Sequence, residues 1–190
     1  MNKRPIKIAI TGTHSTGKST FLDQVEAQLR QKGLVVERFQ SIAVEARALG
    51  FPILSGHTVD STLWIMAECI QREAVATLKA DVILVDRPVS DALGYLEAAL
   101  EVSGRSAKPS RMETVRAIAR GYMAEYDFII ETILDPRVPL GPGRDLDGAL
   151  RVAAAHHIGV FAREYGARRL TLTSSNQAKV LEDVLSRIAA

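Results

Sequence analysis

Residues 12–19 read G-T-H-S-T-G-K-S. It matches the pattern G-x-x-x-x-G-K-[ST] in full, in which glycines let the backbone curl until its N–H groups point inward at phosphate oxygens. The run I-K-I-A-I at residues 6–10 is typical of a buried strand, and residues 18–31 carry apolar side chains on one helical face. Strand, glycine loop and helix is the context that the pattern needs. The sequence therefore predicts a binding site for a nucleoside triphosphate.

Three features of this loop suit a triphosphate together with a metal ion. A helix N-terminus adds partial positive charge, the Lys18 ammonium can reach the β- and γ-phosphates, and the Ser19 hydroxyl can ligate Mg²⁺. The residues expected to hold the nucleotide are Gly12, Thr13, His14, Ser15, Thr16, Gly17, Lys18, Ser19 and Thr20.

The composition indicates one globular domain that needs no metal or disulfide to fold. The chain has 190 residues, 47% hydrophobic and 24% charged, and its net charge of +2 comes without the basic stripe of a bulk nucleic-acid binder. The single cysteine, Cys69, lies in an apolar helical pattern, which indicates a buried, inert thiol and a reducing compartment. The first apolar run is too short for a signal peptide and no stretch approaches a membrane span, so we expect a cytoplasmic protein.

Strand-like and helix-like segments alternate along the whole chain. The predicted strands are residues 6–10, 34–39, 82–85, 128–131 and 169–173. The predicted helices are residues 18–31, 42–49, 58–79, 90–102, 111–125, 145–165 and 176–188. This alternation with near-continuous apolar strands predicts an α/β fold with three layers, α/β/α, around a mostly parallel five-stranded sheet. Ligands of such sheets bind beyond the carboxyl ends of the strands.

A second motif, D-R-P-V-S-D at residues 86–91, follows the apolar strand V-I-L-V directly. This position puts the Asp86 carboxylate beside the phosphate loop, where it can orient Mg²⁺ or accept a proton from an attacking hydroxyl. Arg87 can clamp a phosphate or neutralise charge on the transferred group, although both residues also suit a plain turn fixed by Pro88. For Asp91, a functional role and a favourable interaction with the helix dipole stay equally open.

The third motif is a candidate lid at residues 134–151, an irregular stretch with three prolines and three glycines. Arg144 and Arg151 are seven residues apart, which is two helical turns, so both guanidinium groups can close on a polyphosphate and exclude water. The alternative is a solvated helix start in which Asp147 and Arg151 form an exposed ion pair.

Four stretches together carry a family resemblance: G-T-H-S-T-G-K-S, V-D-R-P-V-S-D after a strand, Y-D-F-I-I as a late strand, and G-R-D-L-D-G-A-L-R before a long helix. They resemble the small P-loop ATPase/kinase domains that include the ribosylnicotinamide kinase domain, within the wider nucleoside- and nucleotide-kinase group. The resemblance implies a kinase-like fold and ATP with Mg²⁺. It also implies Asp86 and Arg87 near the acceptor and the γ-phosphate, and Arg144 and Arg151 in the lid. The chain departs from the family pattern in the lid, where P-G precedes Arg144 and the aspartate is displaced.

In a kinase of this layout the acceptor would lie between the second strand, the long helix and the Asp86 loop. Candidate acceptor residues, each of which a helix surface or the core explains as well, are Glu45, Arg47, Trp64 and Tyr95. The loop at residues 173–177, with Ser174, is a candidate for holding adenine, and helix capping is its alternative role. His156 and His157 are adjacent on a helix and diverge by about 100°, which argues against a metal site.

Three functions follow from these motifs. In the first, a phosphotransferase moves the γ-phosphoryl group of ATP to a hydroxyl or phosphate of a small, nucleoside- or nucleotide-like acceptor. Ser19 and Asp86 would hold the metal, and the catalytic residues would be Lys18, Asp86, Arg87, Arg144 and Arg151. The second is a regulatory ATPase that acts through a protein partner, and the third is a nucleic-acid end kinase. A basic channel for the third would consist of Arg105, Lys108, Arg111, Arg116 and Arg120. A homo-oligomer is compatible with each.

Overall fold

The computed structural model describes residues 4–40, 42–134, 147–166 and 168–188. Its centre is a sheet of five strands in the order β2-β3-β1-β4-β5, in which every neighbouring pair is parallel. The strands are β1 (Ile6–Thr11), β2 (Val36–Phe39), β3 (Val82–Asp86), β4 (Phe128–Thr132) and β5 (Arg169–Leu172). The predicted α/β fold with a five-stranded parallel sheet is confirmed.

The helices follow the predicted order with small differences at their ends. They are α1 (Lys18–Gln31), α2 (Ala43–Ala48), α3 (Val59–Ala76), α4 (Val89–Ser103), α5 (Pro109–Met123), α6 (Gly148–Tyr165) and α7 (Gln177–Ile188). A short 3₁₀ helix, η1 (Leu54–Gly56), was not predicted. The helix expected from residue 58 begins one residue later because Thr58 caps it, accepting a hydrogen bond from the Ser61 N–H. The helix expected from residue 145 is described from Gly148 onward.

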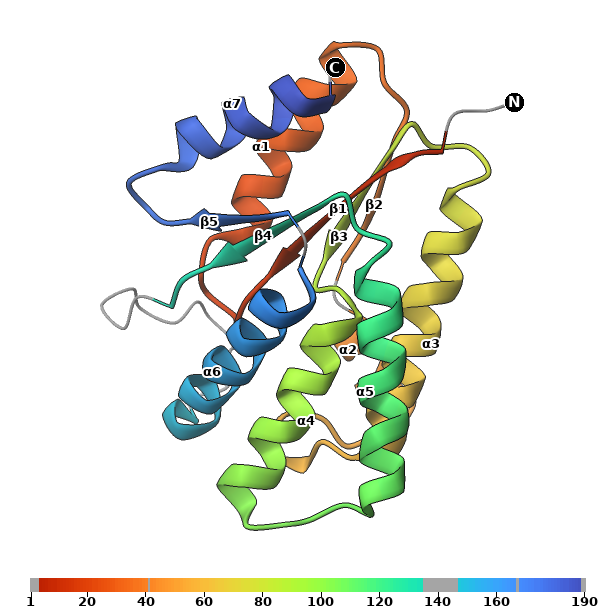
Figure 1. Ribbon diagram of the computed structural model, residues 1–190, viewed down its shortest axis with the longest axis vertical. Coiled ribbons are helices and arrows are strands. Elements are labelled where there is room, and N and C mark those ends of the chain that lie inside the picture. The colour runs from red at the N-terminus through yellow and green to blue at the C-terminus, as the bar shows by residue number, and fades with distance from the viewer. Residues whose placement is uncertain (1–3, 41, 135–146, 167, 189–190) are drawn as a thin grey trace.

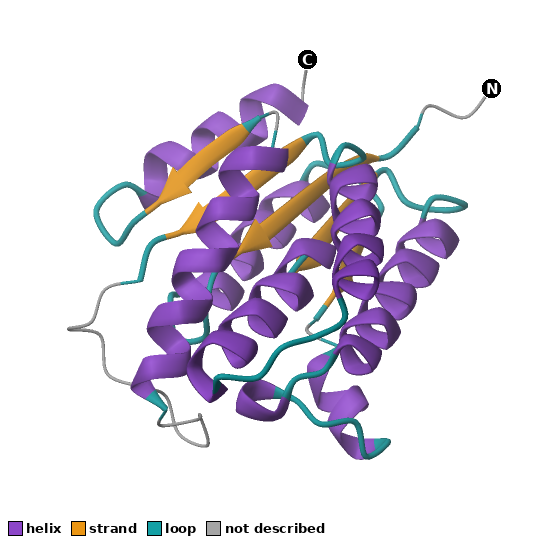
Figure 2. Ribbon diagram, turned by 60° about the horizontal axis from the view of Figure 1, so that its bottom comes forward, coloured by secondary structure: helices purple, strands orange, loops and turns teal. Residues whose placement is uncertain are grey.

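The sheet separates two layers of helices, which Figure 1 shows above and below the strands. Side chains alternate along each strand, so Ile8 and Ile10 of β1 pack with α1 and α7 on one face. Ala9 between them packs on the opposite face, with α3, α4, α5 and part of α6. Figure 2 shows the same three layers with the strands between the helices. Both faces of the sheet are therefore buried, as the apolar strands predict.

The parallel register brings the functional motifs to one edge of the sheet. Ile10 lies opposite Asp86 of β3, and Thr11 lies opposite Glu131 of β4, so the phosphate loop leaves the sheet between the ends of β3 and β4. Ligands of open parallel sheets bind at this edge. Within the described ranges, no helix is long and apolar enough to cross a membrane.

Candidate nucleotide and acceptor site

The phosphate loop has the backbone that its glycines allow. Gly12 has φ 130° and Gly17 has φ 82°, both in the region that L side chains rarely adopt. A Cβ on Gly12 would lie 2.1 Å from Thr132 Oγ1 of β4, whereas a Cβ on Gly17 would meet no atom of the described residues within 4 Å. Gly12 is thus required by close packing. Gly17 stands at the open start of α1, where the first N–H groups of the helix are available to a phosphate.

Lys18 is folded back onto this loop. Its ammonium donates to the Thr13 carbonyl and lies 3.4 Å from Thr16 Oγ1, and the residue is 5% exposed. A buried ammonium bound to a carbonyl keeps its charge close to the loop. The contact keeps the Lys18 ammonium within the loop, and its role toward the β- and γ-phosphates stays a prediction.

Ser19 and Asp86 meet at the edge of the sheet, as the metal prediction requires. The Ser19 hydroxyl donates to Asp86 Oδ2 over 3.1 Å. Asp86 is 7% exposed, and its other oxygen, Oδ1, is buried without a hydrogen-bond partner among the described residues. A buried carboxylate oxygen with no donor, next to a hydroxyl, fits a divalent cation that favours oxygen ligands. No cluster of three or more His, Cys, Asp or Glu side chains in the described part of the chain forms a metal site by itself. The two residues therefore fit Mg²⁺ that arrives with phosphate oxygens.

Arg87 and Asp91 lie behind the first glycine of the loop. Arg87 Nη1 donates to the Gly12 carbonyl over 3.0 Å and to the Tyr95 hydroxyl over 3.3 Å. Asp91 is 2% exposed and accepts from the Thr11 hydroxyl and from the Gly12 N–H. Burial raises the pKa of Asp91 to about 6, and the Arg87 charge and these hydrogen bonds act in the opposite direction. Asp91 thus makes specific contacts with the loop, which the helix dipole alone does not explain.

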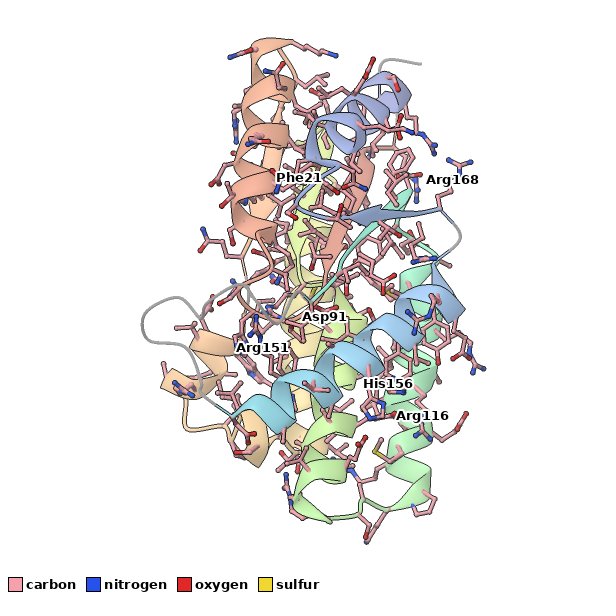
Figure 3. All side chains as sticks on the ribbon, turned by 90° about the vertical axis from the view of Figure 1, so that its left-hand side faces the viewer. Phe21, Asp91, Arg116, Arg151, His156 and Arg168 are labelled. Atoms are coloured by element: carbon pink, nitrogen blue, oxygen red, sulfur yellow. The ribbon has the colours of Figure 1, made fainter. Side chains whose placement is uncertain are left out.

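Arg151 reaches the same loop from α6. Its Nη2 donates to the His14 carbonyl over 3.4 Å, and its Nε is buried without a partner among the described residues. Figure 3 labels Arg151 on α6 and Asp91 on α4, and each of them makes a hydrogen bond to the backbone of the phosphate loop. The alternative for Arg151, an exposed ion pair with Asp147, does not apply because Arg151 is 9% exposed. Arg144 and residues 135–146 of the candidate lid lie outside the described residues.

A cavity of about 260 Å³ adjoins the phosphate loop. Its wall is mostly apolar, with Ile42, Ile53, Leu54, Ile65, Val89 and Ala92 among its members. The polar side chains of the wall are His14, Arg47, His57, Cys69, Arg87, Asp91 and Tyr95. Segments from α2, η1, α3 and the start of α4 thus enclose a space beside the residues of the second motif. Such a mostly apolar cavity with a few polar groups is typical of a small-molecule site.

The sequence analysis missed one polar residue of this wall, His57. It is 3% exposed, and neither ring nitrogen has a hydrogen-bond partner among the described residues. Burial, together with the smaller effect of the nearby Arg105 charge, lowers the pKa of His57 to about 4. The imidazole is therefore neutral at pH 7, with one donor and one acceptor. No motif marks this position, because the loop at residues 50–57 has no periodicity.

The remaining candidates divide between the cavity and other parts of the fold. Arg47 and Tyr95 line the cavity, whereas Glu45 binds Arg72 through two hydrogen bonds. Trp64 stacks on Phe51 with 5.5 Å between ring centroids. Cys69 is buried, and burial raises the pKa of its thiol, in agreement with an inert cysteine.

Ser174, His156 and His157 take part in none of the hydrogen bonds given above for the phosphate loop. Ser174 is exposed in the turn after β5, where Asn176 Oδ1 accepts from the Thr173 N–H over 2.8 Å. This contact orders the turn before α7 and does not cap the helix, so the capping role and the adenine role of Ser174 both stay predictions. His157 lies between Glu97 and Glu101 on α4, at 3.3 and 2.7 Å, with His156 beside it (Figure 3).

The fold and the loop together define a nucleotide-binding α/β protein of the P-loop class. Residues 7–140 match the model of a family described as an AAA domain. This match covers more than half of the chain, and the chain belongs to that AAA-domain family. No curated protein matches the sequence.

Similar solved structures include three of deoxyadenosine kinase from M. mycoides. The structure with bound dATP has a TM-score of 0.68 at 12% identity and covers 97% of this chain and 100% of that chain. The structure with the products dCMP and dCDP has a TM-score of 0.67 at 13% identity, covering 97% and 99%. The structure with dCTP has a TM-score of 0.66 at 14% identity, covering 96% and 100%. At these identities the likeness establishes a nucleoside-kinase-like P-loop fold.

Proposed function

We propose that this chain is an ATP- and Mg²⁺-dependent phosphotransferase whose acceptor is a small nucleoside- or nucleotide-like molecule. The observation that carries the proposal is the cavity of about 260 Å³ beside the phosphate loop. Hydrolysis of ATP needs only water at the γ-phosphate, whereas transfer needs an enclosed second site where the acceptor is held next to it. The likeness of the fold to deoxyadenosine kinase and the sequence resemblance to the ribosylnicotinamide kinase domain favour a nucleoside acceptor.

In this proposal the residues of the phosphate loop bind and orient ATP, and the Asp86 carboxylate accepts the proton of the acceptor. Bound Mg²⁺ would supply charge neutralisation at the phosphate oxygens. Ser19 and Asp86 would hold the ion, and Asp86 Oδ1, which has no donor among the described residues, would also accept the proton of an acceptor hydroxyl. Lys18 would exchange the Thr13 carbonyl for phosphate oxygens.

Three arginines complete the proposed machinery. Arg151, whose Nε has no partner within the described ranges, would donate to the phosphates from α6, and Arg144 would do so from the lid. Arg87 lines the acceptor cavity and would face the transferred group with the nitrogens that its contact with Gly12 leaves available. Phosphoryl transfer depends mainly on positioning and charge stabilisation, so these groups suffice for it.

The nucleic-acid alternative has less support. Of the five basic residues proposed for a channel, Arg111 binds Asp60, Arg116 binds Glu97 and Arg120 lies 3.8 Å from Glu164. Arg105 donates to the carbonyls of Ser55 and His57. Guanidinium groups that are already bound to protein acceptors release few counterions, which is the main source of nucleic-acid affinity. The cavity is also smaller than the range of about 300–1,000 Å³ that drug-sized ligands occupy, which favours one small acceptor.

The experiment that tests the proposal uses γ-labelled ATP with Mg²⁺. The acceptors are a panel of nucleosides, nucleotides, nicotinamide riboside and short oligonucleotide ends. Lys18→Ala removes the ammonium of the loop, and Lys179→Ala on the exposed face of α7 is the matched control. We expect label on one class of small acceptor, lost in Lys18→Ala and kept in Lys179→Ala. Slow release of inorganic phosphate alone, across the whole panel, would instead support the regulatory ATPase.

A further inference from the structure

Two charged side chains of the second motif, Asp91 and Arg87, make hydrogen bonds to the N–H and to the carbonyl of Gly12. Asp91 Oδ2 accepts from the Gly12 N–H over 3.4 Å, and Arg87 Nη1 donates to the Gly12 carbonyl over 3.0 Å. Asp91 Oδ1 also accepts from the hydroxyl of Thr11, the residue before the glycine. The two side chains face each other, with 3.6 Å between Arg87 Nη1 and Asp91 Oδ2. One ion pair thus binds both peptide groups that flank the first glycine of the loop.

We propose that Asp91 is a positioning residue that keeps Gly12 in the conformation needed for phosphate binding, directly through Thr11 and the Gly12 N–H and indirectly through Arg87. In this role Asp91 acts on the phosphate loop through its contacts with Thr11, Gly12 and Arg87, and not through a bond to ATP. The inference rests on the nucleotide site of the proposed function and is independent of whether a phosphoryl group is transferred.

The burial of Asp91 supports this role. At 2% exposure a carboxylate is stable only when hydrogen bonds and an opposite charge compensate the loss of water. All of the compensating contacts that we find come from Thr11, Gly12, Arg87 and the charge of Lys18, which belong to the loop or to its neighbours. An acid that served the helix dipole alone would lie in solvent at the start of α4. Asp91 instead points toward the phosphate loop.

Gly12 is the position where such support matters. Its φ of 130° is open to glycine, and glycine loses more conformational freedom on ordering than any other residue. Hydrogen bonds to both of its peptide groups select one conformation from the many that a glycine can adopt. The N–H groups of the following residues are then aligned before the phosphates arrive.

The charge of Asp91 is sensitive to pH within the range of an ordinary assay. Burial raises the pKa of Asp91 to about 6, against the lowering effects of Arg87, Thr11, Lys18 on α1 and the Gly12 N–H. Further titratable or charged groups on neighbouring elements include Tyr95 on α4, which binds Arg87, and Cys69 on α3, whose thiol pKa the Asp91 charge helps to raise. Arg151 on α6 also belongs to this set, because it donates to the His14 carbonyl of the same loop. Protonation would remove the partner of Arg87 and one acceptor of the loop.

The test measures the affinity for Mg²⁺·AMP-PNP by isothermal titration calorimetry at pH 7.5. Asp91→Asn keeps the shape of the side chain and removes its charge, and Asp60→Asn is the matched control because Asp60 is exposed and pairs with Arg111. We expect the Kd to rise about tenfold or more in Asp91→Asn, the size of a charge-assisted contact. In Asp60→Asn the change should stay within about twofold.

A role in folding alone would not produce the second readout, which is the pH dependence. Below pH 6 the protonated Asp91 of the wild type resembles asparagine. The Kd of Asp91→Asn divided by the Kd of the wild type should therefore fall toward one between pH 7.5 and pH 5.5. The ratio cancels the titration of the nucleotide itself. A ratio near one already at pH 7.5 would overturn the proposal, and so would a ratio that stays constant over this range.

Thr11→Val provides a second variant if Asp91→Asn does not fold. It removes the hydroxyl that donates to Asp91 and leaves the ion pair with Arg87 in place. We expect a rise in Kd of about threefold, the size of one net hydrogen bond. An unchanged Kd in this variant would also overturn the proposal. If the chain does not transfer a phosphoryl group, the label assay shows it, while the Kd values for Mg²⁺·AMP-PNP stay the same. Failure of the proposed function is therefore distinguishable from failure of the role proposed for Asp91.

Discussion

The close approach of α4 and α6 provides a sharp test of the packing that carries Arg151 to the phosphate loop. A Cβ on Gly94 of α4 would lie 2.5 Å from Ile158 Cγ1 and 3.1 Å from the Ile158 backbone nitrogen. The backbone of α6 cannot move aside as the end of a flexible side chain would. Gly94→Ala should therefore push the two helices apart, at a cost of about 1–3 kcal/mol for overpacking.

Helix propensity acts in the opposite direction and can be measured separately. Alanine is favoured over glycine in a helix interior by about 1 kcal/mol. Gly121 lies inside α5, and a Cβ there would meet nothing within 4 Å. Gly121→Ala should accordingly raise the free energy of unfolding by about 1 kcal/mol. The difference between the two variants then isolates the packing cost at the α4–α6 contact.

Urea unfolding at pH 7, with the same slope against urea concentration for each variant, measures both free energies. We expect Gly94→Ala to be less stable than Gly121→Ala by about 1–3 kcal/mol. We also expect weaker binding of Mg²⁺·AMP-PNP in Gly94→Ala alone, because α6 carries Arg151 against the His14 carbonyl. Equal stabilisation by the two substitutions would refute the close approach of these helices.

Three further outcomes are expected. Asp86→Asn should keep the affinity for ATP and reduce transfer at least about a hundredfold, as measured by label transfer, if Asp86 accepts the proton. In Gly12→Ala the new Cβ, 2.1 Å from Thr132 Oγ1, should displace the loop, and calorimetry should detect weaker ATP binding in a chain whose circular dichroism is unchanged. His57 has its pKa lowered from 6.5 to about 4, so the wild type should lose up to about 3 kcal/mol of stability as the pH falls from 6.5 to 4. Burial raises the pKa of Asp91 from 3.8 to about 6, so the folded state gains stability from this group as the pH falls through the same range. Measured by urea unfolding, the free energy of unfolding should therefore fall more steeply with decreasing pH in Asp91→Asn than in the wild type. In His57→Gln it should fall less steeply.

The fold and the phosphate loop were predictable because their signals are local. The loop at residues 12–19 has a fixed spacing, and the nearly continuous burial along β1 is what an apolar strand of a parallel sheet predicts. Asp86 was predictable because its strand ends at the edge where ligands bind. The role of Arg151 was open between lid and ion pair, and only the folded chain shows that its side chain is buried and donates to the His14 carbonyl.

The acceptor cavity was not predictable because residues distant in sequence build it. Residues 42–57, 65–69 and 87–95 all contribute to its wall, and periodicity does not tell which segments face each other. His57 follows a 3₁₀ turn that the pattern does not mark. Trp64 could equally have faced a base or the core, and its partner Phe51 became visible only in the folded chain.

Backbone strain gives an independent reason to place function at this edge of the sheet. Among the described residues, three non-glycine positions have positive φ: Ser15 at 57°, Leu54 at 60° and Arg87 at 78°. Ser15 belongs to the phosphate loop, and Leu54 and Arg87 line the cavity. Each such conformation costs on the order of 1–3 kcal/mol and persists only where the surrounding structure enforces it. All three strained positions of the described residues thus lie at the phosphate loop or the cavity beside it. Since strain of this kind persists at functional sites, it favours a triphosphate and an acceptor at this place over a purely structural role.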